Sequence, residues 1–169
     1  TSKTHVHALC DGAKNCWNVV ESLRGFCGKM TCILDWFHIT MKIQNISLPE
    51  DMKKVLLESV KWHLWRGNVE KAIEGLDGLI AKTSSGKQQT RVIKFKNYIF
   101  NNKDKIVNYE QRQKDGLVFT SNLAESTVES LINQRCKGHQ HMRWSREGLN
   151  PVLQLRAAIN NQCDWESKV

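Results

Sequence analysis

Long apolar runs are absent from this sequence. A membrane-spanning helix needs about 20 consecutive apolar residues, and no stretch of the chain approaches that length. The first seven residues lack the apolar core of a secretory signal peptide. Low-complexity segments are also missing, and the chain has 2 Pro and 10 Gly with 40% hydrophobic and 25% charged residues. This composition is typical of a soluble globular protein, and 169 residues suffice for one domain with room for an insertion.

Cysteine pairs at metal-binding or redox spacing are a second absence. None of the six cysteines forms a CxxC motif, and without an export signal we expect reduced thiols in a cytoplasmic protein. Two groupings contain both cysteine and histidine, namely Cys27, Cys32 and His38, and Cys136, His139 and His141. Their spacings do not match the usual structural zinc patterns, so the sequence disfavours zinc.

Acidic residues are too few to balance the basic ones. The formal net charge is +8 and the sequence pI is about 9.3. Such an excess of positive charge indicates a polyanionic partner, most often nucleic acid. A basic protein that binds no polyanion is the alternative, and charge alone leaves it open.

Two short apolar segments near the N-terminus are typical of β-strands. The first, residues 4–10, ends at Asp11-Gly12, and the second, residues 29–34, ends at Asp35. The intervening residues 13–26 carry apolar side chains at helical spacing, which predicts a parallel strand–helix–strand unit. Functional groups gather at the carboxyl ends of parallel strands, so we expect Asp11 and Asp35 at one edge.

Most of the remaining chain is predicted to be helical. One helix starts at Pro49 and ends near Gly67, and the next starts after Asn68, so the two form an antiparallel hairpin. Further helices are expected at residues 87–101, 103–114 and 148–159. The sequence therefore predicts an α/β protein that is helix-rich overall.

One more helix, which starts at Asn122, carries two carboxylates. Glu125 lies three residues after Asn122, which predicts a capping box. The helical spacing sets Glu125 at the boundary between core and solvent, and Glu129 farther into water. Two interpretations of Glu125 stay open: a cap worth about 1 kcal/mol to the helix, or a carboxylate that takes part in chemistry.

The case for chemistry rests on Asp11 and Glu125 together. Two carboxylates that converge from a strand end and a helix start make an oxygen site suited to Mg²⁺ or Mn²⁺. Two such ions, about 3.5–4 Å apart, stabilise the attacking and leaving oxygens of a phosphoryl transfer. This chemistry on DNA would also account for the positive charge.

Several motifs in chain order carry a resemblance to a known family. They are CDGAKNCW, ILDWFH, a helical block, NLAESTVESLINQRCKG, MRWSREG and LQLRAA. With them the chain resembles the DDE transposases of bacterial insertion sequences, in particular the Mutator-like and ISKra-type group. The resemblance covers nearly the whole chain, and it implies an RNase H-like fold with three metal-binding acids.

The resemblance assigns roles to four residues. Asp11 resembles the second acid and Glu125 the third, while Asp35 and His38 match the family's (C/D)xxH motif and would support the site. A structural hydrogen bond between Asp35 and His38 is an equal alternative. By the same resemblance, residues 1–46 form the first part of the RNase H-like core, 47–115 a helical insertion, and 116–169 the catalytic and C-terminal helices.

The family's activity is metal-dependent DNA strand cleavage followed by strand transfer. Its first Asp lies upstream of Asp11, so this chain resembles the C-terminal part of a transposase and is expected to be incomplete or inactive alone. The resemblance implies Mg²⁺ or Mn²⁺, DNA at element ends and target sites, self-association of the complete enzyme, no membrane, and the bacterial cytoplasm and nucleoid. A non-catalytic DNA-binding remnant and an RNase H-like nuclease are the alternatives.

Candidate DNA contacts fall into two groups. The densest basic and aromatic group consists of Arg135, Lys137, Arg143, Trp144 and Arg146, with a solvated turn as the alternative. In related transposases a Trp of the insertion stacks on a base, which Trp62 or Trp65 could do, although core packing is favoured for both. The basic residues between Lys87 and Lys96 are expected to form an ordinary charged helix face, with an added non-specific attraction to DNA as the alternative.

Overall fold

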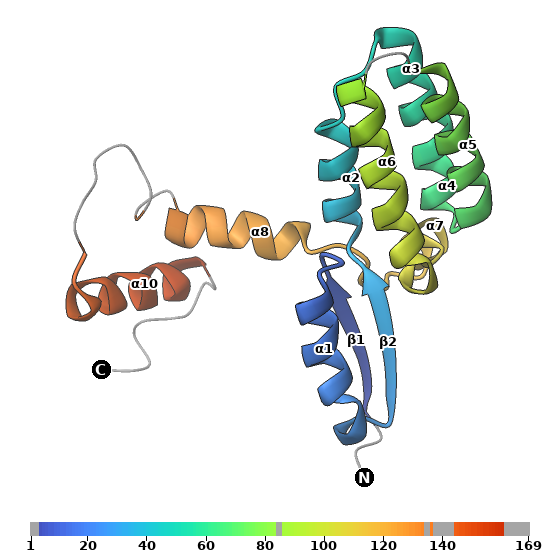
Figure 1. Cartoon of the computed structure of the whole chain (residues 1–169). Helices are drawn as coiled ribbons and strands as arrows, with labels where there is room; N and C mark the ends of the chain where they lie inside the picture. Colours follow the sequence, from blue (N-terminus) through green and yellow to red (C-terminus); the bar gives the residue numbers. More distant parts are fainter. Residues whose placement is uncertain (1–3, 84–85, 134–135, 137–143, 161–169) are drawn as a thin grey trace. The chain divides into compact units, whose positions relative to one another are not determined.

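The computed structural model describes residues 4–83, 86–133, 136 and 144–160. The chain divides into two compact units, Thr1–Ser121 and Asn122–Val169, and each is described by itself. It is helix-rich with two short parallel strands, as the sequence predicts, while the RNase H-like fold itself stays a prediction (Figure 1). No helix in the described ranges is long and apolar enough to cross a membrane.

The first unit begins with the predicted strand–helix–strand motif. Strand β1 (His5–Cys10) pairs in parallel with β2 (Lys29–Leu34), and the register joins Cys10 to Leu34. Helix α1 (Lys14–Ser22) and a 3₁₀ turn (Arg24–Phe26) connect them. Asp11 and Asp35 therefore leave the two strands at the same edge, which confirms the predicted arrangement of these two residues.

Helix α2 (Trp36–Gln44) follows β2 without a loop. The sequence predicts helical character only from Ile39, but the helix begins three residues earlier. The reason is Asp35, whose side chain accepts a hydrogen bond from the Phe37 N–H and caps the helix.

The predicted helical hairpin is present in the first unit. Its first arm runs through α3 (Glu50–Val55), a π-helical turn (Leu56–Val60) and α4 (Lys61–Trp65), and its second arm is α5 (Val69–Lys82). Gly67 turns the chain between the arms at φ +73°, with the backbone of Asn108 only 3.2 Å from where a Cβ would lie. Helix α6 (Gly86–Asn101) then packs against α5.

The predicted helix over residues 103–114 is broken in the structure. A 3₁₀ turn (Lys103–Lys105) is separated from α7 (Tyr109–Lys114) by three non-helical residues. Two of them, Ile106 and Val107, pack against the core, and Asn108 caps α7 by accepting from the Gln111 N–H. Burial of the two apolar residues and the new cap outweigh helix continuity here.

One hydrophobic core joins the end of β2, α2, the hairpin, α6 and α7. Its fully buried side chains include Ile33, Leu34, Ile39, Leu56, Leu64, Leu76, Val92, Ile99 and Tyr109. The carboxyl end of β2 lies inside this core, because Ile33 and Leu34 have no exposed surface. The helical block therefore holds the strand ends directly.

The second unit consists of two helical segments within the described residues. Helix α8 (Asn122–Val128) continues as a π-helical stretch (Glu129–Asn133), and α10 (Arg146–Asn160) covers the predicted C-terminal helix. Arg156 of α10 donates to the carbonyl oxygens of Leu131 and Ser130, at 3.0 and 2.5 Å. These bonds connect α10 to the π-helical stretch.

Candidate functional site

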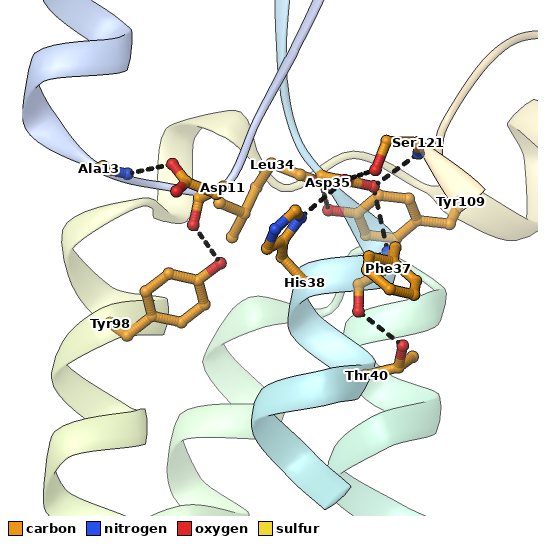
Figure 2. A network of polar contacts seen from close by, with 10 residues as sticks. All are labelled: Asp11, Ala13, Leu34, Asp35, Phe37, His38, Thr40, Tyr98, Tyr109 and Ser121. Carbon is orange, nitrogen blue, oxygen red and sulfur yellow. Dashed lines mark hydrogen bonds and ion pairs between the residues drawn. The ribbon is translucent and has the colours of Figure 1, made fainter. Parts of the chain in front are cut away.

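Asp11 occupies a tight turn directly after β1 (Figure 2). Its Oδ1 accepts a hydrogen bond from the Ala13 N–H at 2.8 Å, and the intervening Gly12 has φ +92°. A Cβ on Gly12 would lie 2.6 Å from Cε2 of Tyr98 and 3.0 Å from Cδ1 of Leu34. Glycine is therefore required here both by the backbone conformation and by the space available.

Two tyrosines of the helical block bind the backbone where the strands end. Tyr98 of α6 donates to the carbonyl oxygen of Asp11 at 2.9 Å, and Tyr109 of α7 donates to that of Leu34 at 2.7 Å. Burial is the largest cause that raises the pKa of both phenols. The second cause is electrostatic: Asp11 raises the pKa of Tyr98, and Tyr98 raises that of Tyr109. Both phenols therefore keep their protons at neutral pH and act as donors.

Asp35 is the most highly connected polar side chain at this edge. It is 2% exposed, and its Oδ1 accepts from the N–H groups of Phe37, at 3.1 Å, and Ser121, at 3.0 Å. Its Oδ2 accepts from Nδ1 of His38, at 2.8 Å, and from the Ser121 hydroxyl. Asp35 thus links β2, α2 and the segment that leads into α8 (Figure 2).

His38 is oriented by this carboxylate. A carboxylate only accepts hydrogen bonds, so the Asp35 contact requires the proton on Nδ1 and leaves Nε2 as the acceptor of a neutral ring. The His38 side chain is 35% exposed. The hydrogen bond that the sequence suggested between Asp35 and His38 is present, and a role for His38 in orienting substrate stays a prediction.

Glu125 and Glu129 belong to the second unit. Both side chains are exposed, and Glu129 accepts a hydrogen bond from Nδ2 of Asn133 at 2.8 Å. Asn122 is the first residue of α8, and the capping box of Asn122 and Glu125 stays a prediction. Glu125 is exposed and not at a core boundary; its pairing with Asp11 stays a prediction.

A comparison with protein families identifies the chain at the family level. The model of an uncharacterised protein family, UPF0236, matches residues 2–168. The chain belongs to the UPF0236 family. No curated protein and no solved structure matches it.

The tryptophans of the UPF0236 helical hairpin differ in their surroundings. Trp62 is 48% exposed on α4. Trp65 packs in an aromatic cluster, with ring centroids 4.8 Å from Trp36, 5.5 Å from Phe119 and 6.1 Å from Tyr109. Contact of either tryptophan with DNA stays a prediction, and only Trp62 has a large exposed surface for it.

The basic and aromatic group in the second unit is described only in part. Arg135, Lys137 and Arg143 lie outside the described residues. Arg146 is the first residue of α10. Trp144 is half-buried, and its indole N–H has no hydrogen-bond partner within the described ranges. Their proposed DNA contacts stay predictions.

The described cysteines have free thiols, and those of Cys10 and Cys16 interact with Asp11. Cys10, Cys16, Cys27, Cys32 and Cys136 form no disulfide. Burial, with Cys16 and Asp11 nearby, raises the pKa of Cys10 to about 11. The pKa of Cys16 is also raised, by desolvation first and then by Asp11. Within the described ranges, no group of three or more His, Cys, Asp or Glu side chains is arranged to hold a metal ion.

Sequence reasoning did not find the residues that bind the strand ends. Tyr98 falls in the helix predicted at residues 87–101, and Tyr109 in the helix predicted at 103–114. A buried tyrosine hydroxyl needs a hydrogen-bond partner, which was the available signal. The partners lie 87 and 75 residues away in the sequence, so the signal could not identify them.

Proposed function

We propose that this chain is the catalytic-domain part of a DDE-type DNA transposase, with Asp11 and Glu125 as two of its three metal-binding acids. The observation that carries the proposal is the hydrogen bonding of Ser121 to Asp35 at the strand-end edge. It ties the residue just before the Glu125 helix to the edge where Asp11 emerges. The motif resemblance supports the same assignment.

The length of chain between the anchor and the glutamate supports convergence of the two acids. Ser121 is bonded to Asp35, and neighbouring strands of a sheet lie about 4.8 Å apart. Glu125 follows Ser121 by four residues, so its Cα lies within about 14 Å of the anchor by covalent reach alone. A glutamate at this distance can meet a carboxylate at the end of the adjacent strand.

The donor chemistry of Asp11 fits Mg²⁺ or Mn²⁺. Its carboxylate is partly exposed, and Oδ1 accepts the one backbone hydrogen bond of the turn. Asp35 does not fit as a ligand, because both of its oxygens are already occupied by protein donors. Bound divalent ions would supply charge stabilisation for phosphoryl transfer.

The protein groups around Asp11 have positioning roles in this proposal. The Tyr98 hydroxyl and the close packing of Gly12 fix the backbone from which the Asp11 carboxylate projects. Asp35 holds His38 with Nε2 free to accept a proton or a hydrogen bond from a bound hydroxyl group. In this proposal a divalent ion held by the Asp11 carboxylate would offset the negative charge of the phosphodiester.

A second candidate function is DNA binding without chemistry. It is favoured by the exposed basic side chains of α6. The two candidates differ in whether Asp11 and Glu125 are needed for anything beyond binding.

The test is a strand-cleavage assay with Mg²⁺ in a chain that includes the upstream acid which the resemblance requires. We expect Asp11→Asn and Glu125→Gln to reduce cleavage to background while DNA binding persists. Glu129→Gln is the matched control and should cleave like wild type. Loss of cleavage in Glu129→Gln but not in Glu125→Gln would show the assignment to be wrong, and no cleavage in wild type would favour binding alone.

A further inference from the structure

Helix α6 carries a one-sided stripe of positive charge. Lys87, Arg91 and Lys94 are exposed and follow one another at spacings of four and three residues, which puts them on one face. Tyr98 continues the same spacing. The helix contains no Asp or Glu, so no acidic neighbour on its own surface offsets these charges.

A groove between α2 and α6 lies beside this stripe. The two helices run side by side in Figure 1, and Lys42 of α2 adds a fourth cation. A cavity of about 360 Å³ is lined by Lys42, Asn45, Ile46, Arg91, Lys94, Phe95 and Tyr98. A second hollow shares Arg91 and Lys94 and extends past Lys87 and Thr90 to Gly86. The two hollows form one continuous basic surface.

The cations of this surface are not neutralised by carboxylates. Among the described residues, Lys42, Lys87, Arg91 and Lys94 form no ion pair, whereas Lys96 on another side of α6 pairs with Asp77 at 2.5 Å. The Lys42 ammonium lies 4.5 Å from the centroid of the Tyr98 ring. Four exposed cations that have no carboxylate partner in the described part of the chain are therefore available to a polyanion.

The groove leads to the candidate catalytic edge. Tyr98 lines the groove and donates its hydroxyl proton to the carbonyl oxygen of Asp11. From Lys87 to Tyr98, α6 rises by about 16 Å. This length corresponds to about five nucleotides at 3.4 Å per nucleotide of one strand. The same tyrosine thus belongs to both the basic surface and the Asp11 turn.

We propose that the groove between α2 and α6 binds the phosphodiester backbone of DNA and directs it toward Asp11. Ile46 and Phe95 also line the groove but are only 6% and 4% exposed. The positive charge of Lys42, Arg91 and Lys94 complements the phosphates of a nucleic-acid backbone. Lysine and arginine bind phosphates with release of counterions, without reading sequence. The choice of DNA rests on the proposed function, but binding needs no metal and no chemistry at Asp11.

The test compares two triple variants of the full chain that lose equal charge. The groove variant is Lys42→Gln/Arg91→Gln/Lys94→Gln, and the control, on α3 and α5, is Lys53→Gln/Lys54→Gln/Lys71→Gln. Fluorescence anisotropy measures binding to a short labelled DNA duplex of mixed sequence. Circular dichroism melting checks that both variants fold.

The expected result is a change in salt dependence that is confined to the groove variant. Each lost phosphate contact reduces the slope of log K against log[salt] by about 0.9, so three contacts reduce it by about 2.7 and weaken binding on the order of 10²-fold at 0.1 M salt. The control should change affinity far less. Equal losses in both variants, or no duplex binding by wild type in about 50 mM salt, would overturn the proposal.

A footprint on the wild-type chain gives the answer without variants. The duplex should protect Lys42 and Lys94 from acetylation, detected by mass spectrometry, and should leave Lys53 and Lys54 reactive. Equal protection of all four lysines would refute the groove. Neither measurement depends on cleavage: groove binding with no cleavage would defeat only the proposed function, and cleavage with an unaffected groove variant would defeat only the present inference.

Discussion

Asp35→Ala tests the hydrogen-bonded junction that organises the candidate site. The substitution removes the acceptor for the Phe37 and Ser121 N–H groups, for Nδ1 of His38 and for the Ser121 hydroxyl. All four donors surround a side chain that is 2% exposed, so water cannot readily replace the lost acceptor.

The expected cost can be worked out from these bonds. Loss of an N-cap acceptor alone costs about 1 kcal/mol, and hydrogen bonds to a charged group contribute about 1.5–3 kcal/mol each, without strict additivity. We expect Asp35→Ala to reduce the free energy of unfolding by about 3–5 kcal/mol. Asp35→Asn should cost less, about 1–3 kcal/mol, because its oxygen can serve the two N–H groups while the serine hydroxyl and His38 ring re-orient.

Urea unfolding followed by tryptophan fluorescence measures the free energy of unfolding of these variants, with a signal from residues close to Asp35. Trp36 and Trp65 lie in the aromatic cluster of the first unit, and Trp36 directly follows Asp35. Asp104→Ala is the matched control, because Asp104 is exposed, and it should stay within about 0.5 kcal/mol of wild type. An Asp35→Ala variant as stable as Asp104→Ala would refute the assigned role of Asp35.

Two further predictions concern the Asp11 turn. Gly12→Ala should lower the free energy of unfolding by about 1–3 kcal/mol, because the new side chain meets a φ of +92° and a contact at 2.6 Å. Gly25→Ala is the control, because no atom lies within 4 Å of its new Cβ. Equal urea midpoints for the two variants would contradict the predicted strain at Gly12. The raised pKa of Tyr98 means that the unfolded chain loses this proton first, so stability should fall as pH rises above the ordinary value of 10.0, by up to about 1.4 kcal/mol per pH unit. Urea titrations of Tyr98→Phe at alkaline pH should show a shallower fall than wild type, and parallel curves would contradict it.

Local patterns were sufficient to predict most helices and strands. The strand at residues 29–34 has the predicted bounds, and the helix predicted at 87–101 begins one residue earlier at Gly86. The parallel pairing follows from two strands joined by a helix, and it brings Asp11 and Asp35 to one edge. Periodicity and topology rules alone carry this information.

Local patterns failed where distant contacts decide the structure. The helix predicted at 103–114 is broken because Ile106 and Val107 pack against the core. The earlier start of α2 has a local cause instead, the Asp35 cap. Helix continuity is worth little per residue compared with burial of an apolar side chain.

The candidate site was predictable only in its position. The two aspartates that follow the strands indicated which edge of the sheet carries the site. They did not indicate which groups donate hydrogen bonds to Asp35. Ser121 lies 86 residues from Asp35 in the sequence, and no spacing rule connects them. The α6 side of the basic groove was predicted as the charged face between Lys87 and Lys96. The contribution of Lys42 was not, because Lys42 and Lys94 belong to different helices that only the folded chain brings together.

Manganese binding tests most directly whether Asp11 and Glu125 share a metal ion. In NMR spectra of the chain, Mn²⁺ should broaden the amide signals of Gly12 and Ala13, which adjoin the Asp11 carboxylate. Both Asp11→Asn and Glu125→Gln should weaken the broadening at a given Mn²⁺ concentration, while Glu129→Gln should match wild type. Broadening that survives Asp11→Asn, or that is lost in Glu129→Gln but not in Glu125→Gln, would contradict the account.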